Sequence, residues 1–367
     1  YHALKMVPKD EQTLPRYRAA FNLFRQIGPT PRRYINEKAL ADFMLDEAAA
    51  LLYVGGAGSC MGCGEATAIR MMLAATGFVY QPENIGIVAS TGCNTVYGST
   101  YPYNPYLVPW TNSLFENAPA DAMGIRARWD QMGWQPRKLW VIGGDGAMYD
   151  IGFQSLSRML TSAMDINVLI LDTQAYSNTG GQASTASFPG QDAKMASFGK
   201  ASPGKRERRK ELAQICMMHP DIYVAQTTAA HINHFYKAIM EANEYPGPAV
   251  VNVYTTCQPE HGVPDCNSSR QAKLAVESRA FPLFIYDPRK GDKLRERLSL
   301  VGNPAQKQDW WTPPNGDKPF QFVDFARTEG RFAKQFGADG APSETLLHAQ
   351  ADRVKNWRLL QELAGLR

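Results

Sequence analysis

Short apolar segments that alternate with helical segments constrain the fold of this chain more than any other feature. Strand-like apolar runs occur at residues 85–88, 139–142, 166–171, 222–225 and 249–253. Segments with apolar residues at helical spacing separate them, at residues 66–75, 112–132, 153–164 and 229–242. Fully apolar strands that alternate with helices are typical of a parallel sheet covered by helices on both faces. The pattern therefore predicts an α/β fold that binds ligands at the carboxyl ends of its strands.

Helical extensions are expected at both ends of this sheet region. Helical spacing recurs at residues 14–27, 37–52 and 343–366, and residues 281–286 form one further strand-like run. After residue 265 the apolar residues are too scattered to form a separate core, so we expect this part to wrap around the domain or a neighbour. The prediction is an N-terminal helical arm (1–54), an α/β domain (55–265) and a C-terminal extension (266–367).

Composition excludes several classes of protein. The 39 Lys and Arg residues against 35 Asp and Glu residues give a net charge of +4, which is too mild to predict nucleic-acid binding. No run of about 18 apolar residues predicts a membrane span, and the first residues lack the apolar core of a signal peptide. We therefore expect a cytoplasmic protein. The chain starts at Tyr1 and not at a methionine, so we expect it to be processed, truncated or cut from a longer polypeptide.

A basic run, KRERRK, occupies residues 205–210. We expect it to open a helix, and we interpret it as a solvated face, which is the usual role of such runs. The alternative is a docking surface for an acidic electron-carrier protein.

A glycine-rich turn follows the strand at residues 139–142. The turn reads Gly143-Gly144-Asp145-Gly146 and precedes the helix at residues 153–164. Glycines let the backbone approach a phosphate, and a helix N-terminus offers free N–H groups to an anion. Asp145 adds a hard oxygen ligand for the Mg²⁺ that normally accompanies a diphosphate.

A second loop follows the next strand, in the sequence DTQAYSNTGG at residues 172–181. Thr173 can provide a hydroxyl ligand and Ala175 a carbonyl ligand, so two adjacent loops would hold one Mg²⁺ and one diphosphate. A GDG triplet followed by an Asn-containing loop is the pattern of thiamine diphosphate enzymes. The alternative interpretation is two ordinary turns between strand and helix.

Six cysteines are too few in a chain of this length for a disulfide scaffold. Cys60 and Cys63 form a CxxC pair, which is compatible with zinc, a redox dithiol or part of an iron–sulfur site. Cys93 and Cys257 follow predicted strands, at the same edge of the sheet as Asp145. Four thiolates beside a cofactor suit a [4Fe–4S] cluster, and a structural zinc site is the alternative.

Two cysteines stay outside this set. Cys216 lies within a predicted helix, in the sequence ICMM, where a buried small apolar side chain is the expected role. Cys266 lies in a polar turn, and the sequence assigns no role to it.

With these motifs in place, the sequence resembles the pyruvate:ferredoxin oxidoreductase family, within the wider group of 2-oxoacid:ferredoxin oxidoreductases. The resemblance covers roughly residues 55–260. Several motifs in one order carry it, namely GSCMGCGE (58–65), ASTGC (89–93), WTNSLFE (110–116), GDGAMYDIG (144–152) and YSNTGGQ (176–182). It implies a thiamine diphosphate-binding domain that also carries the cluster nearest to thiamine.

The resemblance also implies roles for individual residues. The cluster ligands are Cys60, Cys63, Cys93 and Cys257. The Mg²⁺ ligands are Asp145, Thr173 and the carbonyl oxygen of Ala175. The contacts to thiamine diphosphate are Glu65, Cys93, Gly144, Asp145, Gly146, Ala147, Thr173, Gln174, Ala175, Tyr176, Ser177 and Asn178. Glu65 and Asn178 are the implied catalytic residues, and Asn178 would also face the substrate.

The implied reaction is the oxidative decarboxylation of a 2-oxoacid, with pyruvate favoured, to an acyl-coenzyme A. Electrons would leave singly through the cluster to ferredoxin or flavodoxin. The glutamate that activates the aminopyrimidine in this family lies in a domain that has no counterpart here, so we expect a partner subunit or domain to supply it, within a dimeric complex. Two alternatives stay open: a non-oxidative thiamine decarboxylase or ligase with a structural zinc, and a non-catalytic scaffold or electron-transfer subunit that has lost thiamine.

Overall fold

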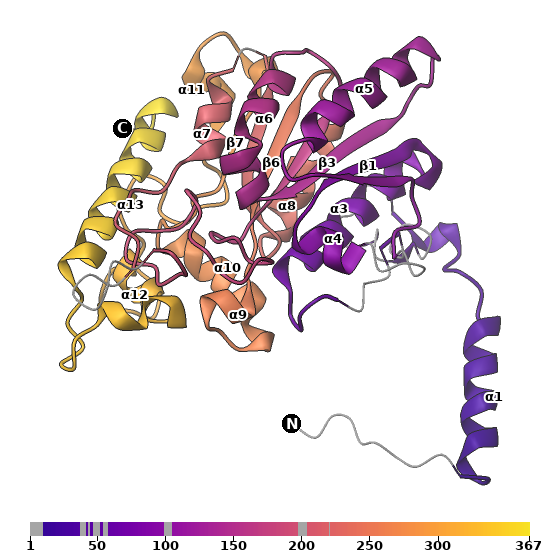
Figure 1. Ribbon diagram of the computed structural model, residues 1–367, viewed down its shortest axis with the longest axis horizontal. Helices are drawn as coiled ribbons and strands as arrows, with labels where there is room; N and C mark the ends of the chain where they lie inside the picture. Colours follow the sequence, from indigo (N-terminus) through magenta and orange to yellow (C-terminus); the bar gives the residue numbers. More distant parts are fainter. Residues whose placement is uncertain are drawn as a thin grey trace.

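The computed structural model describes residues 10–36, 42, 45–46, 52–53, 58–98, 105–196, 204–219 and 221–367 (Figure 1). Within them, one eight-stranded sheet has the order β2-β1-β3-β4-β6-β5-β7-β8. The strands are β1 (Ile85–Ser90), β2 (Trp110–Ser113), β3 (Lys138–Gly144), β4 (Asn167–Asp172), β5 (Tyr223–Thr228), β6 (Ala249–Tyr254), β7 (Phe284–Tyr286) and β8 (Leu298–Ser299). Strands β1 to β6 run parallel to one another, which confirms the predicted parallel sheet. β7 and β8 extend it as antiparallel strands at one edge.

Helices cover both faces of the sheet, as predicted. The longer helices are α1 (Thr13–Gln26), α3 (Gly64–Tyr80), α5 (Ala118–Gln131), α6 (Phe153–Leu160), α8 (Ile232–Glu244), α10 (Ser268–Glu277) and α13 (Glu344–Leu363). The shorter ones are α4 (Cys93–Gly98), α7 (Leu212–Met217), α9 (Gln258–His261), α11 (Leu294–Arg297) and α12 (Phe322–Ala326). Short helical turns lie at Arg32–Tyr34, Pro82–Asn84, Gly146–Ile151, Asp265–Asn267, Pro288–Lys290 and Gly330–Gln335.

Side chains that point alternately to the two faces of the sheet divide the core into two layers. Leu139 and Val141 of β3 pack in one apolar cluster with residues of α5, α6, α7 and α13. Trp140 and Ile142 of the same strand pack in a second cluster with residues of α3 and α8. Because neighbouring side chains of a strand point to opposite faces, a continuously apolar strand needs a helical layer on each side.

The segment at residues 112–132 was predicted as one helix, and this prediction is wrong at its start. Residues 110–113 form β2, which pairs in parallel with β1, and α5 begins only at Ala118. The sequence of β2 is WTNS, and its residues are exposed or half-buried. A short polar edge strand has no apolar run to reveal it. The predicted helix at residues 37–52 lies mostly outside the described residues.

The basic run at residues 205–210 does not form a helix, because α7 begins at Leu212. The expected solvated face is also wrong for part of the run, since Lys205 and Arg209 are each only 5% exposed. Arg209 forms an ion pair with Asp172, the last residue of β4. Arg208 does face outward, and it forms an ion pair with Asp352 of α13 at 3.2 Å. Partners within the fold, rather than water, therefore surround the inward-facing half of the run.

The C-terminal part of the chain packs against the sheet, whereas α1 projects away from it (Figure 1). Trp357 and Leu360 of α13 belong to the same apolar cluster as β3 and β4. A third cluster joins Phe322, Phe325 and Phe332 to Phe188 and Tyr254. No residue of α1 is buried. Among the described residues, none of the helices is both long enough and apolar enough to span a membrane. The proposed three-part division remains a prediction.

Trp357 is expected to be a major anchor of α13. Its side chain is fully buried, its Nε1 donates to the Gln308 carbonyl at 2.7 Å, and the Arg279 guanidinium lies 4.1 Å from its ring centroid. We predict that Trp357→Ala lowers the free energy of unfolding by about 3–5 kcal/mol, as large cavities in cores do. Leu359→Ala, at a side chain that is 45% exposed, is the matched control. Chemical denaturation that gave equal losses for both variants would contradict this packing.

Candidate functional site

The four sequence motifs meet because their strands are neighbours. β1, β3, β4 and β6 lie side by side in this order, and they are parallel. Cys93, Asp145, Thr173 and Cys257 follow the carboxyl ends of these four strands. One edge of the sheet therefore presents both predicted metal sites, as expected for parallel α/β folds.

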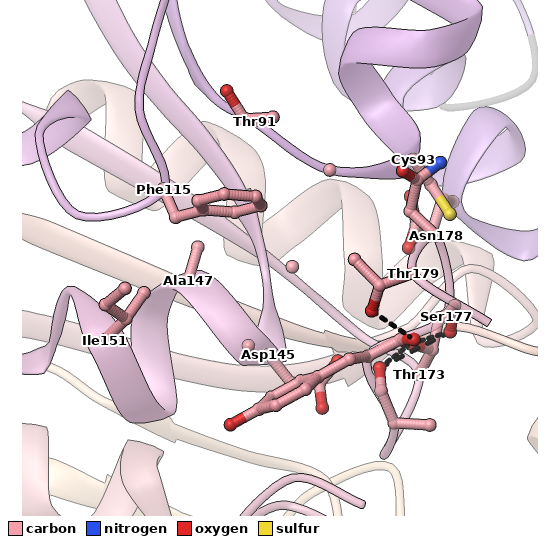
Figure 2. A pocket seen from close by; sticks show the side chains of 16 residues that line it. Thr91, Cys93, Phe115, Asp145, Ala147, Ile151, Thr173, Ser177, Asn178 and Thr179 are labelled. Carbon is pink, nitrogen blue, oxygen red and sulfur yellow. Dashed lines mark hydrogen bonds between the residues drawn. The ribbon is translucent and has the colours of Figure 1, made fainter. Parts of the chain in front are cut away.

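A cavity of about 260 Å³ lies at this edge (Figure 2). The predicted cofactor contacts that line it are Glu65, Cys93, Gly144, Asp145, Gly146, Ala147, Thr173, Ala175, Tyr176, Ser177 and Asn178. Gln174 belongs to the same loop but does not line the cavity, and it is fully buried. Phe115, Ala147 and Ile151 form one side of the cavity, opposite Cys93 and Asn178 (Figure 2).

Sequence reasoning assigned no role to five lining residues, which are Thr91, Gly92, Phe115, Ile151 and Thr179. All of them lie within the motifs that carried the family resemblance, so position in a motif was the available signal. Thr91 is held by a hydrogen bond from its hydroxyl to the Ser113 carbonyl, at 2.7 Å. That bond joins the turn after β1 to the end of β2, just before Phe115.

Three oxygen atoms from two loops converge beside the cavity. The Thr173 hydroxyl lies 3.1 Å from Asp145 Oδ1 and 3.1 Å from the Ala175 carbonyl oxygen. The other carboxylate oxygen of Asp145 accepts from the Ser184 hydroxyl at 2.5 Å. A carboxylate, a hydroxyl and a carbonyl are the oxygen donors that Mg²⁺ prefers. These residues therefore fit the predicted Mg²⁺ site.

The Asp145 carboxyl is 1% exposed. Burial, together with repulsion from Asp172, raises the pKa of Asp145 well above its ordinary value. Hydrogen bonds from Ser184 and Thr173 act in the opposite direction. A divalent cation beside this carboxylate would compensate its buried charge, which is the electrostatic condition for a metal site in a low-dielectric environment.

Three of the four predicted cluster thiols lie close enough to interact electrostatically. The charge of Cys257 raises the pKa of Cys63, and the charges of Cys257 and Cys63 both raise the pKa of Cys93. Burial is the main cause in every case, and it raises the pKa of Cys63 to about 12 and that of Cys257 to about 11. Thiols in this state carry protons that a bound metal would have to displace. Cys63, Cys93 and Cys257 are thus neighbouring, partly buried thiols.

Cys60 differs from the other three thiols. It is exposed, and its carbonyl oxygen accepts a hydrogen bond from the Cys63 N–H at 3.2 Å, which closes the CxxC turn. Among the described residues, no three His, Cys, Asp or Glu side chains are arranged to hold a metal ion. The four-thiol ligand set therefore stays a prediction. Cys216 is fully buried, and Cys266 is exposed.

Glu65 lies in the first turn of α3 and lines the cavity, close to Cys63 and Cys93. Its carboxylate accepts from the Tyr97 hydroxyl at 2.9 Å, and burial raises its pKa to about 7. Gly64 lets α3 start this close to β6, because a Cβ on Gly64 would lie 2.5 Å from the Thr256 nitrogen. The sequence CGE at residues 63–65 thus combines a thiol, a close backbone approach and a buried carboxyl.

Comparison with known proteins gives a consistent picture. Residues 90–253 match the family model described as thiamine pyrophosphate enzyme, C-terminal TPP binding domain. The chain is 36% identical to pyruvate synthase subunit PorB of Pyrococcus furiosus, over 62% of this chain and 70% of that protein. It is 30% identical to pyruvate-flavodoxin oxidoreductase of Rhodospirillum rubrum, over 84% of this chain and 30% of that protein. The chain thus spans about a third of the length of the pyruvate-flavodoxin oxidoreductase.

A longer match and one solved structure complete the comparison. Pyruvate:ferredoxin oxidoreductase of Moorella thermoacetica is 29% identical, over 98% of this chain and 35% of that protein. A 2-oxoglutarate:ferredoxin oxidoreductase from Magnetococcus marinus, solved with 2-oxoglutarate, coenzyme A and succinyl-CoA bound, is 25% identical with a TM-score of 0.44. It covers 55% of this chain and 64% of that one.

The two glycines of the GDG triplet are expected to differ in their tolerance of a side chain. A Cβ on Gly146 would lie 2.7 Å from the Tyr176 ring, whereas on Gly144 the nearest atom, the Leu171 carbonyl oxygen, lies at 3.8 Å. We predict that Gly146→Ala lowers the free energy of unfolding by about 1–3 kcal/mol through overpacking, and that Gly144→Ala changes it much less. Thermal unfolding of the two variants checks this, and the reverse order would contradict it.

Proposed function

Because the chain belongs to the pyruvate:ferredoxin oxidoreductase family, as its thiamine diphosphate-binding part, we propose that it provides the diphosphate-binding half and the proximal [4Fe–4S] cluster of a 2-oxoacid oxidoreductase. Pyruvate is the proposed substrate. The main support is that the oxygen atoms of Asp145, Thr173 and Ala175 lie at the same sheet edge as three interacting thiols. A diphosphate site beside a thiol cluster is what coupling of decarboxylation to electron transfer requires.

The bound groups supply the chemistry and the chain positions them. When bound, thiamine diphosphate would supply the nucleophile and the electron sink for decarboxylation, and a [4Fe–4S] cluster would supply one-electron redox chemistry. Asp145, Thr173 and the Ala175 carbonyl hold Mg²⁺ in this proposal, and the backbone at Gly144 and Gly146 leaves room for the diphosphate. Phe115 and Ile151 give the cavity an apolar side, which would lie next to the reacting centre.

One loop connects the proposed diphosphate site with the thiols. The Ser177 hydroxyl lies 2.7 Å from the Thr173 hydroxyl. Burial raises the pKa of Cys257, and a hydrogen bond with Ser177 partly offsets that rise. The next residue, Asn178, forms a hydrogen bond with Cys93 that partly offsets the rise in the Cys93 pKa caused by burial. In the proposal, Asn178 also orients the substrate, and Glu65 contacts the cofactor.

The rest of the proposed enzyme lies outside this chain. A partner subunit or domain would carry the glutamate that activates the aminopyrimidine, and coenzyme A would accept the acyl group. Ferredoxin or flavodoxin would accept the electrons, and the complex would be a dimer in the cytoplasm. Relatives support this assignment, since one is named as a subunit and another is about three times as long as the matched region.

Removing the charge of Asp145 tests the diphosphate site. We predict that Asp145→Asn weakens Mg²⁺-dependent binding of thiamine diphosphate by at least about 100-fold, since this carboxylate is the only charged group among the three proposed ligands. Isothermal titration calorimetry with Mg²⁺, and with a chelator instead, measures the effect. Asp121→Asn, at an exposed site on α5, is the control. Wild-type affinity in Asp145→Asn would contradict the proposed Mg²⁺ site, and absence of binding in the wild-type protein itself would favour a scaffold without thiamine.

Serine substitutions test the proposed cluster. We predict that Cys93→Ser and Cys257→Ser each lose most of the iron and acid-labile sulfide of the anaerobically purified protein, because a cluster needs all its thiolates. Cys266→Ser, at an exposed cysteine outside the set, should keep both. Electron paramagnetic resonance of the reduced protein gives a second measure. Stoichiometric zinc without iron in the wild-type protein would support a non-oxidative thiamine enzyme instead.

A further inference from the structure

The loop after β4 turns sharply at Gln174, which has a φ of +56°. This left-handed conformation is unfavourable for a residue with a side chain and persists only where surrounding contacts hold it. Gln174 lies between Thr173 and Ala175, and the turn brings the hydroxyl of the first to 3.1 Å from the carbonyl oxygen of the second. The backbone of Gln174 therefore sets the distance between two of the proposed metal ligands.

Hydrogen bonds fix Gln174 from several directions. Its backbone N–H and its side-chain Nε2 donate to Asp172 Oδ1, at 3.1 and 2.9 Å. Its carbonyl oxygen accepts from the Ser187 hydroxyl at 2.5 Å and from Gln191 Nε2 at 2.8 Å. Its side-chain Oε1 accepts from Arg331 Nη1 at 3.1 Å. Arg331 is the only one of these partners that belongs to the C-terminal part of the chain.

Arg331 is 3% exposed and reaches two glutamines with one nitrogen. Its Nη1 also lies 3.3 Å from Gln191 Oε1, and its Nε donates to Glu329 Oε2 at 2.6 Å. Glu329, which is 2% exposed, also accepts from the Tyr254 hydroxyl at 3.0 Å. A buried ion pair of this kind adds little net stability, because desolvation offsets most of its attraction. Its geometry indicates that it orients Gln174.

Helix α9 and the glycine that follows it connect residues 329–331 with the loop by a second route. The His261 Nε2–H donates to the Thr173 carbonyl at 2.9 Å, and His261 Nδ1 lies 3.7 Å from Glu329. Gly262 and Gly330 let the two segments meet, since a Cβ on Gly262 would lie 2.8 Å from the Gly330 Cα. Backbone contact between them places Glu329 and Arg331 directly behind the loop.

We infer that Arg331, with Glu329 as its counter-ion, is a positioning residue that holds Gln174 in the conformation needed for Thr173 and Ala175 to bind the metal. This inference rests on the proposed function of the loop. Arg331 acts through Gln174 and touches neither the cavity nor its ligands. The C-terminal segment at residues 329–331 is thus a structural part of the cofactor site, although it lies far beyond the residues that match the thiamine pyrophosphate model.

The test measures how much Mg²⁺ is needed for thiamine diphosphate to bind to the assembled oxidoreductase. We expect Arg331→Met to raise the half-saturating Mg²⁺ concentration 10–100-fold, the usual effect of removing a partner that orients metal ligands. The double variant Glu329→Gln/Arg331→Met leaves no unpaired buried charge, and we expect the same shift without a large fall in melting temperature. Arg327→Met removes an exposed arginine that contacts only the Gly340 carbonyl and the Phe336 ring among the interactions described, and should bind like wild type.

A double-mutant cycle with Gln174→Asn separates positioning from general damage. Asn tolerates the left-handed conformation but is too short to keep the contact with Arg331. If Arg331 acts through Gln174, adding Arg331→Met to Gln174→Asn should raise the Mg²⁺ requirement less than twofold further. Wild-type Mg²⁺ dependence in folded Arg331→Met, or full additivity in the cycle, would overturn the inference alone. Absence of Mg²⁺-dependent binding in the wild type would overturn the proposed function with it.

Discussion

Parallel alignment of four adjacent strands is the constraint on which the site depends. β1, β3, β4 and β6 end at one edge of the sheet, so the residues that follow them meet although they are far apart in sequence. Register sets the depth at which they meet: Gly144 pairs with Leu171, and Asp172 pairs with Tyr254. Asp145 and Thr173 consequently leave neighbouring strands at nearly the same level, which places their oxygen atoms 3.1 Å apart.

Buried charge explains the arrangement around this edge. Asp172 ends β4 in the interior, and its carboxylate is paired with the buried guanidinium of Arg209 and accepts from the Tyr149 hydroxyl at 2.6 Å. Glu329 and Arg331 form a second buried pair behind the same loop. A charge in a low-dielectric interior is strongly unfavourable without a partner. Asp172 and Glu329 thus each have a cationic partner, and the two cations come from segments outside the sheet.

Features whose sequence pattern is local were predictable, and features that depend on contacts between distant residues were not. Apolar strands and the glycine-rich turn after β3 were predictable because their patterns are local. Strand β2 was not, because a short polar edge strand carries no apolar signal. Arg209 was interpreted as solvated because the sequence does not show that Asp172 lies opposite it. Gln174 was predicted to contact the cofactor, whereas its side chain is turned toward Asp172 and Arg331.

Local sequence was sufficient for the fold class, the order of the motifs and the family, because strand periodicity and glycine-rich turns depend on neighbouring residues. Contacts between distant segments were not accessible in this way. The position of Arg331 behind Gln174 depends on how the C-terminal part of the chain folds back. The ion pair of Arg209 with Asp172 likewise depends on how residues 205–210 pack against the end of β4. Hydrogen bonds and ion pairs across such distances leave no periodic pattern in a single sequence, so three-dimensional packing alone reveals them.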